Sequence, residues 1–256
     1  MTTMRSIARL AAMGGLCLLG LAVQAQVPAN GPAYIEASVA SVETLINASQ
    51  GKALPRLADP VEGKVLDDVW NETAILGKGP YTGADIPALL GIVQKQARVL
   101  QIYSQFSPDG KQPDLARNAA TYQDELTRSH VFTLKAIAAA FQAMTDFDAQ
   151  LKPEDRTEAR LQGLKQMRAG LLEIATGAAK ALSGPAMKPQ NQLLIARAFA
   201  DNTASIVGGL APANRQALAA ALQAADAALK GDAKKPVADF VKATTATACE
   251  GLCRLN

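Results

Sequence analysis

The chain has 256 residues, of which 4% are aromatic and 19% are charged, with 26 Lys and Arg against 23 Asp and Glu. Two of the basic residues, Arg5 and Arg9, lie within the first 25 residues, so the remainder carries 24 basic and 23 acidic side chains and is nearly neutral. A neutral chain has no electrostatic basis for binding nucleic acid or an anionic membrane surface, and we expect neither partner.

The first 25 residues have the layout of a cleavable secretory signal. Arg5 and Arg9 form a short basic region, and residues 10–23 follow without a charge. Val23-Gln24-Ala25 places small or neutral side chains where a signal peptidase requires them. The apolar run of about 14 residues is shorter than the roughly 20 that a spanning helix needs, so an uncleaved anchor is the weaker alternative. We therefore predict a signal peptide at 1–25 and a mature, periplasmic or extracellular chain that begins at Gln26.

The first part of the mature chain is predicted to contain three helices. Residues 26–32 (QVPANGP) contain turn-forming residues and predict a flexible N-terminal segment. Apolar side chains then recur at helical spacing over three stretches. These are 33–49, 61–76 and 86–106. Asp85 is expected to cap the third helix, with Pro87 in its first turn, after a Pro- and Gly-rich loop that contains Tyr81.

The longest periodic pattern covers residues 114–152, where neither glycine nor proline occurs. It predicts one helix of about 37 residues. A kink near Ser129-His130, where the apolar stripe becomes polar, is the alternative. Four further helices are predicted by turn residues that bound periodic segments. They cover residues 153–182, 189–209, 213–229 and 235 to the C-terminus.

No segment shows the alternating pattern of a β-strand, so we predict an all-α protein. Short connections favour antiparallel neighbours and therefore an up-and-down helical bundle or a helical array of about seven to eight helices. Residues 33–256 are predicted to form a single all-helical domain, and a subdomain split near 107–113 is the alternative. No stretch of the mature chain is apolar enough to predict a transmembrane segment.

The sequence lacks the residues that common cofactors and catalytic sites require. His130 is the single histidine, whereas a di-metal helical bundle needs two Glu-x-x-His pairs. The HExxH, CxxCH, GxSxG and P-loop patterns are absent. Ser129 and His130 point about 100° apart on a helix, so they cannot form a nucleophile–base pair by themselves. We therefore expect no metal, no cofactor and no enzymatic activity based on these motifs.

Cys249 and Cys253 are the cysteines of the predicted mature chain, and we expect them to form a disulfide. Cysteines four positions apart fit a disulfide poorly on an intact helix, and Gly251 between them can unwind the last turn. Such a small loop adds little stability and would serve to fix the terminus. The alternatives are a redox pair or a copper(I) site that uses both thiols.

Three functional hypotheses follow. The first is a non-enzymatic interaction or structural protein of the cell envelope, which binds an envelope protein or itself through an exposed apolar stripe on a long helix. The second is a carrier for a small apolar ligand held between helices, with contacts near Trp70 and Tyr81. The third is an enzyme of unrecognised type, in which His130 would need a carboxylate from another helix.

Overall fold

The computed structural model describes residues 26–255, and the predicted signal peptide at 1–25 lies outside that range. Every regular element within residues 26–255 is a helix, which confirms the predicted all-α class. The α-helices are α2 (Gly31–Ala48), α3 (Pro60–Val69), α4 (Glu72–Ile75), α5 (Ile86–Ser104), α6 (Leu115–Thr121), α7 (Gln123–Gln150), α8 (Glu158–Ala181), α9 (Pro189–Asp201), α10 (Thr203–Gly209), α11 (Pro212–Ala225) and α12 (Lys234–Ala246). The short 3₁₀ helices are η1 (Gly83–Asp85), η2 (Pro153–Asp155), η3 (Asp226–Ala228), η4 (Gly231–Ala233) and η5 (Gly251–Arg254).

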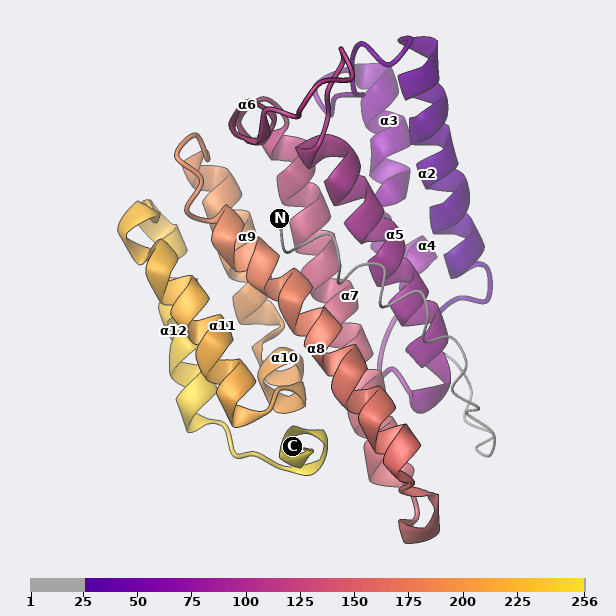
Figure 1. Cartoon of the computed structure of the whole chain (residues 1–256), viewed down its shortest axis with the longest axis vertical. Coiled ribbons are helices and arrows are strands. Elements are labelled where there is room, and N and C mark those ends of the chain that lie inside the picture. Colours follow the sequence, from indigo (N-terminus) through magenta and orange to yellow (C-terminus); the bar gives the residue numbers. More distant parts are fainter. Residues whose placement is uncertain (1–25, 256) are drawn as a thin grey trace.

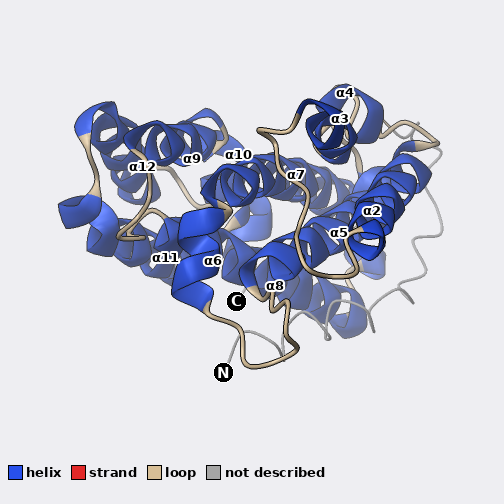
Figure 2. Ribbon diagram, turned by 90° about the horizontal axis from the view of Figure 1, so that it is seen from above, coloured by secondary structure: helices blue, strands red, loops and turns tan. Residues whose placement is uncertain are grey.

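The long helix α7 lies at the centre of the molecule and is contacted by helices from both halves of the chain. On one side α7 packs against α5, which contacts α2, and α2 contacts α3 and α4. On the other side α7, α9, α12, α11 and α8 contact one another in that order, and α8 returns to α7. These five helices close a ring, and Figures 1 and 2 show α2 to α5 placed on the opposite side of α7 from α9, α11 and α12.

The segment between α2 and α5 runs alongside α7 in the same direction as that helix. The side chain of Arg56 bonds to Glu125 near the beginning of α7, with Nε and Oε1 3.1 Å apart. Towards the other end, the backbone N–H of Gly83 donates to the carboxylate of Asp146 over 2.9 Å. Between these two points Asp67, Trp70 and Glu72 bond to side chains of α7, and these contacts hold residues 56–83, including α3 and α4, to the central helix. The least regular part of the chain is thus fixed by tertiary contacts.

Three predicted helices are each broken in two, although neither glycine nor proline stands at the breaks. The helix expected over 61–76 is divided into α3 and α4 at Trp70, and the helix expected over 189–209 is divided at Asn202. The predicted 37-residue helix is divided into α6 and α7 at Tyr122, and it is not kinked at Ser129-His130. All three break residues have φ between −106° and −118° and ψ between 12° and 27°. This backbone conformation lies outside the α region and ends a helix.

The break at Tyr122 has a tertiary cause. The Tyr122 ring packs edge-on against Tyr103 and Phe106 at the end of α5, with ring centroids 5.5 and 5.8 Å apart. The short helix α6 turns back so that the buried Asn118 donates from its amide to the carbonyl oxygens of Ser104 and Phe106. Those carbonyls lie at the end of α5, where the helix has no further N–H groups to donate to them. Bending the chain at Tyr122 therefore satisfies the end of a neighbouring helix.

Asp85 stands at the N-cap position of α5, as predicted, but its side chain does not bond to the amides of that helix. Its Oδ2 atom instead accepts from the backbone N–H and the hydroxyl of Thr82. Its Oδ1 atom accepts from the backbone N–H groups of Gln26 and Val27 over 2.7 and 2.8 Å. The segment that we predicted to be flexible therefore begins with two amides bonded to a fully buried carboxylate.

The last predicted helix is shorter than expected. Helix α12 ends at Ala246, and the chain continues through an irregular stretch into η5. Gly251 adopts φ +53°, a left-handed conformation that glycine takes at no steric cost. None of the helices within residues 26–255 is long and apolar enough to cross a membrane.

Candidate functional site

Trp70 lies at the end of α3 and is buried against the central helix. Its indole Nε1 donates to the hydroxyl of Ser129 over 3.1 Å. The guanidinium of Arg128 lies 5.8 Å from the centre of the indole ring, in cation–π geometry. Only 5% of Trp70 is exposed, so the tryptophan acts as a packing residue that joins α3 to α7. It offers little surface to a ligand.

His130 follows Ser129 on α7 and is largely buried. Its Nδ1 atom has no hydrogen-bond partner within residues 26–255. Burial disfavours the charged imidazolium and lowers the pKa of His130 to about 4. A general base in a hydrolase is oriented by a partner on its second nitrogen, often a carboxylate. Within the described residues, the His130 Nδ1 atom has no partner of this kind.

Tyr81 lies in the loop before η1 and does not share a site with Trp70. Its backbone N–H donates to the side-chain amide oxygen of Gln142 over 3.3 Å. Gln142 is thirteen positions beyond Ser129 on α7, which corresponds to about 20 Å along the helix. Burial, followed by the negative charges of Asp85 and Glu72, raises the pKa of the Tyr81 phenol. Of the predicted contact residues, Trp70 and His130 therefore lie near the same part of α7, and Tyr81 lies apart from them.

Cys249 and Cys253 lie in the irregular segment after α12. Their sulfur atoms are 2.10 Å apart and their Cα atoms 5.3 Å apart, so the predicted pairing is present. Cys253 is completely buried, whereas Cys249 is partly exposed. Within residues 26–255, no group of three or more His, Cys, Asp and Glu side chains gathers in a way that could hold a metal ion.

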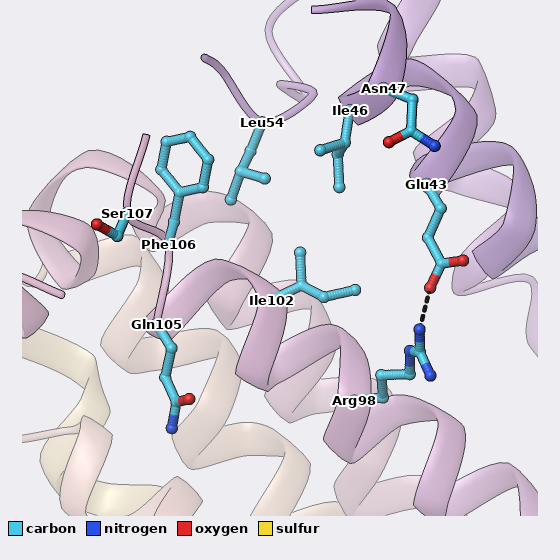
Figure 3. Close-up of a pocket in the computed structure, with 9 residues that line it drawn as sticks. All are labelled: Glu43, Ile46, Asn47, Leu54, Arg98, Ile102, Gln105, Phe106 and Ser107. Atoms are coloured by element: carbon cyan, nitrogen blue, oxygen red, sulfur yellow. Dashed lines mark hydrogen bonds and ion pairs between the residues drawn. The ribbon is translucent and has the colours of Figure 1, made fainter. Parts of the chain in front are cut away.

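A groove with a volume of about 370 Å³ lies between the C-terminal parts of α2 and α5 and is open to solvent on one side. Both helices and the loops that follow them supply its lining, which consists of Glu43, Ile46, Asn47, Leu54, Arg98, Ile102, Gln105, Phe106 and Ser107. Figure 3 shows four apolar side chains of this set directed towards a common space, with polar side chains around them. We call this feature the α2–α5 groove.

The charges of the α2–α5 groove are paired at one edge. The guanidinium of Arg98 and the carboxylate of Glu43 are 2.5 Å apart and link the two helices, as Figure 3 shows. A second exposed ion pair, between Lys95 and Glu36, lies one turn earlier on α5 and two turns earlier on α2. Exposed pairs of this kind contribute little to stability, about 1 kcal/mol or less. Their side chains are therefore available to exchange partners when another charged group approaches.

The apolar floor of the groove is held by the core beneath it. Leu54 is only 3% exposed, and the next residue, Pro55, accepts a hydrogen bond from the buried hydroxyl of Tyr103 over 2.8 Å. This bond fixes the loop after α2 against α5. Ile46, Ile102 and Phe106 are partly buried and pack against the core. The floor of the groove is thus part of the packed core.

No sequence pattern predicts this groove. Its apolar side chains come from two helix ends that lie about fifty residues apart, and none of them belongs to a motif with known chemistry. A sequence signal would have required knowing that α2 packs against α5. Comparison with protein-family models, with curated proteins and with solved structures finds no match for this chain.

Proposed function

We propose that this protein is an exported, non-enzymatic binding protein of the cell envelope, and that it accepts a segment of a partner protein in the α2–α5 groove. The observation that supports binding is the groove itself, with an apolar floor and a rim of polar and paired charged groups. This arrangement resembles the centre and rim of a protein–protein interface. A partner side chain with an apolar body would displace water from Ile46 and Ile102.

The groove fits a protein segment better than a free small ligand. Carrier sites enclose most of their ligand's surface, about 70–90%. A groove that is open along one side encloses less, and it suits one or two side chains presented by a larger surface. The exposed large apolar side chains of the described chain are Val61, Leu115 and Leu194, which lie on three different helices. They do not form the stripe on a long helix that we expected, so the groove is the better candidate for a binding surface.

The small-ligand carrier remains the second candidate, because about 370 Å³ falls within the volume range of small-molecule sites. An apolar ligand would lie on Leu54 and Phe106, and Trp70, Tyr81 and His130 would not contact it. The two candidate functions differ in whether a small molecule stays bound during purification. A carrier purified gently retains a small molecule that native mass spectrometry detects, whereas a partner-binding protein does not.

Photo-crosslinking in the intact cell tests the partner hypothesis. A photoreactive amino acid replaces the exposed Asn47 at the groove, and the matched control replaces the exposed Lys242 on α12. We expect a defined protein adduct from position 47 that the additional change Ile102→Glu abolishes, because a charge is then placed on the apolar floor. Circular dichroism verifies that this variant remains folded. Adducts that are equal at both positions, or that survive Ile102→Glu, would contradict the proposal.

The surroundings of Asp85 support maturation at the predicted cleavage site. This carboxylate is fully buried, and it takes part in no ion pair within residues 26–255. A buried carboxylate without a counter-charge is costly. Cleavage after Ala25 would convert the Gln26 nitrogen, which lies 2.7 Å from Oδ1, into an α-ammonium group. Signal-peptide cleavage would therefore place a positive charge next to the Asp85 carboxylate.

The intact mass of the protein recovered from the periplasm or medium tests this part of the proposal. We expect a chain of residues 26–256, and a free amine at Gln26 would appear on N-terminal labelling. A full-length chain retained in the cytoplasm would contradict export. A mass lower by one ammonia would indicate that Gln26 has cyclised, and the ion pair with Asp85 would then be absent.

A further inference from the structure

Two buried arginines bind the C-terminal segment that contains the disulfide. Arg168 on α8 donates to the carbonyl oxygen of Leu252 over 2.8 Å and also to that of Leu255. Arg215 on α11 donates to the carbonyl oxygens of Thr247 and Ala248. These two guanidinium groups bond to the backbone before, within and after the loop. The segment is therefore fixed to the core by contacts that do not involve the disulfide.

The disulfide is accordingly not needed to hold the terminus. It joins cysteines only four positions apart, and cross-links that close such short loops remove little entropy from the unfolded chain. The four hydrogen bonds from charged donors are each stronger than ordinary neutral ones. A purely structural role therefore does not explain why the two cysteines are paired.

The two sulfur atoms have different surroundings. Cys249 is partly exposed, whereas Cys253 is completely buried. The Nη2 atom of Arg215 lies 3.1 Å from Sγ of Cys253 and donates to it. Neither Arg215 nor Arg168 takes part in an ion pair within residues 26–255. Cys249 is thus the more accessible of the two cysteines, and Cys253 lies beside a guanidinium that forms no ion pair within residues 26–255.

We propose that Cys249–Cys253 is a thiol–disulfide exchange site that reacts with a dithiol, either a small molecule or a dithiol protein, and that attack occurs at Cys249. The positive charge of Arg215 stabilises Cys253 as the departing thiolate. A sulfur that leaves as a stabilised thiolate leaves faster, and attack is directed to the sulfur that the reagent can reach.

A thiolate of the dithiol attacks Sγ of Cys249 and forms a mixed disulfide, while the bond to Cys253 breaks and its electron pair remains on Cys253. The second thiol of the dithiol, having lost its proton, attacks the reagent's own sulfur in the mixed disulfide and releases Cys249. The protein gains two electrons and two protons once both cysteines are protonated, and the dithiol is oxidised to a disulfide.

The rate of reduction tests the role of Arg215 with a matched control. The folded mature protein is treated with dithiothreitol, and free thiols are counted over time in the unchanged protein, in Arg215→Gln and in Arg168→Gln. Both arginines bind carbonyl groups of the same segment, but only Arg215 contacts a sulfur. We expect Arg215→Gln to slow reduction by about tenfold, because the leaving thiolate loses its cation. Arg168→Gln should leave the rate nearly unchanged or increase it by loosening the segment.

Equal rates in all three proteins, or an equal slowing in both variants, would overturn the proposal. A second measurement requires no variant. The unchanged protein is exposed to glutathione, quenched with acid and mapped by mass spectrometry. We expect glutathione on Cys249 and a free thiol at Cys253. Glutathione divided evenly between the two cysteines, or found only after the protein is unfolded, would show that the disulfide is structural.

Discussion

Single buried charged and polar groups make several tertiary contacts that no sequence pattern predicts. Asp85 was expected to cap α5, but it binds Thr82 and the first two described residues instead. No sequence pattern distinguishes Arg168 and Arg215 from other arginines, because arginines on helices are usually exposed. Their partners are backbone carbonyls far away in the chain, and a backbone carbonyl leaves no signal in a sequence. Packing decides such contacts, so they become visible only in the folded chain.

The ion pair predicted between Gln26 and Asp85 can be measured with a thermodynamic cycle. Extending the mature chain by one alanine turns the Gln26 ammonium group back into an amide, which keeps the hydrogen bond to Asp85 but carries no charge. We expect the extension to lower the free energy of unfolding by about 1–2 kcal/mol, because a hydrogen bond from a charged donor is roughly twice as strong as one from a neutral amide. In the Asp85→Asn background the same extension should cost much less. Urea unfolding of the four chains provides the values, and equal costs in both backgrounds would contradict the pair.

His130 predicts a dependence of stability on pH. Its pKa is about 4 in the folded chain and 6.5 as the ordinary value, so the unfolded chain takes up the proton more readily. The contribution of the neutral His130 side chain to the free energy of unfolding is fully present above about pH 6.5. It is lost as the pH decreases towards 4. The upper limit of the loss is about 3 kcal/mol.

The chain has a single histidine, so NMR of the imidazole protons reports on His130 alone. We expect no protonation of the folded protein above about pH 5. The variant His130→Gln should lose this part of the pH dependence of unfolding, while the carboxylates continue to titrate. An imidazole that titrates near its ordinary pKa in the folded protein would show that the site is solvated.

The sequence predicted where the helices lie far better than where they are interrupted. The starts at Pro60, Pro189 and Pro212 agree with the predictions to within a residue, because proline fits the first turn of a helix. The breaks at Trp70, Tyr122 and Asn202 were missed. Helical spacing of apolar residues continues through each break, so periodicity alone could not reveal them. The α2–α5 groove was missed for a related reason, since it depends on which helices become neighbours.

Helix α10 provides a prediction with an internal control. A Cβ atom added to Gly209 would lie 2.6 Å from Cγ of the fully buried Phe141 on α7, whereas one added to Gly208 would meet nothing within 4 Å. We expect Gly209→Ala to destabilise the protein by about 1–3 kcal/mol, the usual cost of overpacking. Gly208→Ala should stabilise it by up to about 1 kcal/mol through the unfolded state. Thermal unfolding measures both, and equal effects would mean that α10 does not approach α7 closely.

The arrangement of the whole molecule follows from the position of α7. This helix belongs to the closed ring with α8, α9, α11 and α12, and it also carries α5 and the segment 56–83. Its buried residues are accordingly distributed around its circumference and include Phe132, Ile137 and Phe141. A helix that is apolar on most of its faces is typical of the centre of a large helical protein. Both halves of the chain therefore share one helix and one continuous core.

A shared core predicts that residues 26–255 unfold as one unit, which would rule out the subdomain split near 107–113. Trp70 is the single tryptophan of the chain, and it bonds to Ser129 across the contact between the N-terminal helices and α7. Its fluorescence in urea should therefore change at the same midpoint as the helical circular dichroism, which reports on every helix. The variant Ser129→Ala removes the bond to the indole while keeping a small side chain, and it should shift both midpoints together. If tryptophan fluorescence changed at a lower urea concentration than circular dichroism, helices α2 to α5 would be separating from α7 while the ring remained folded.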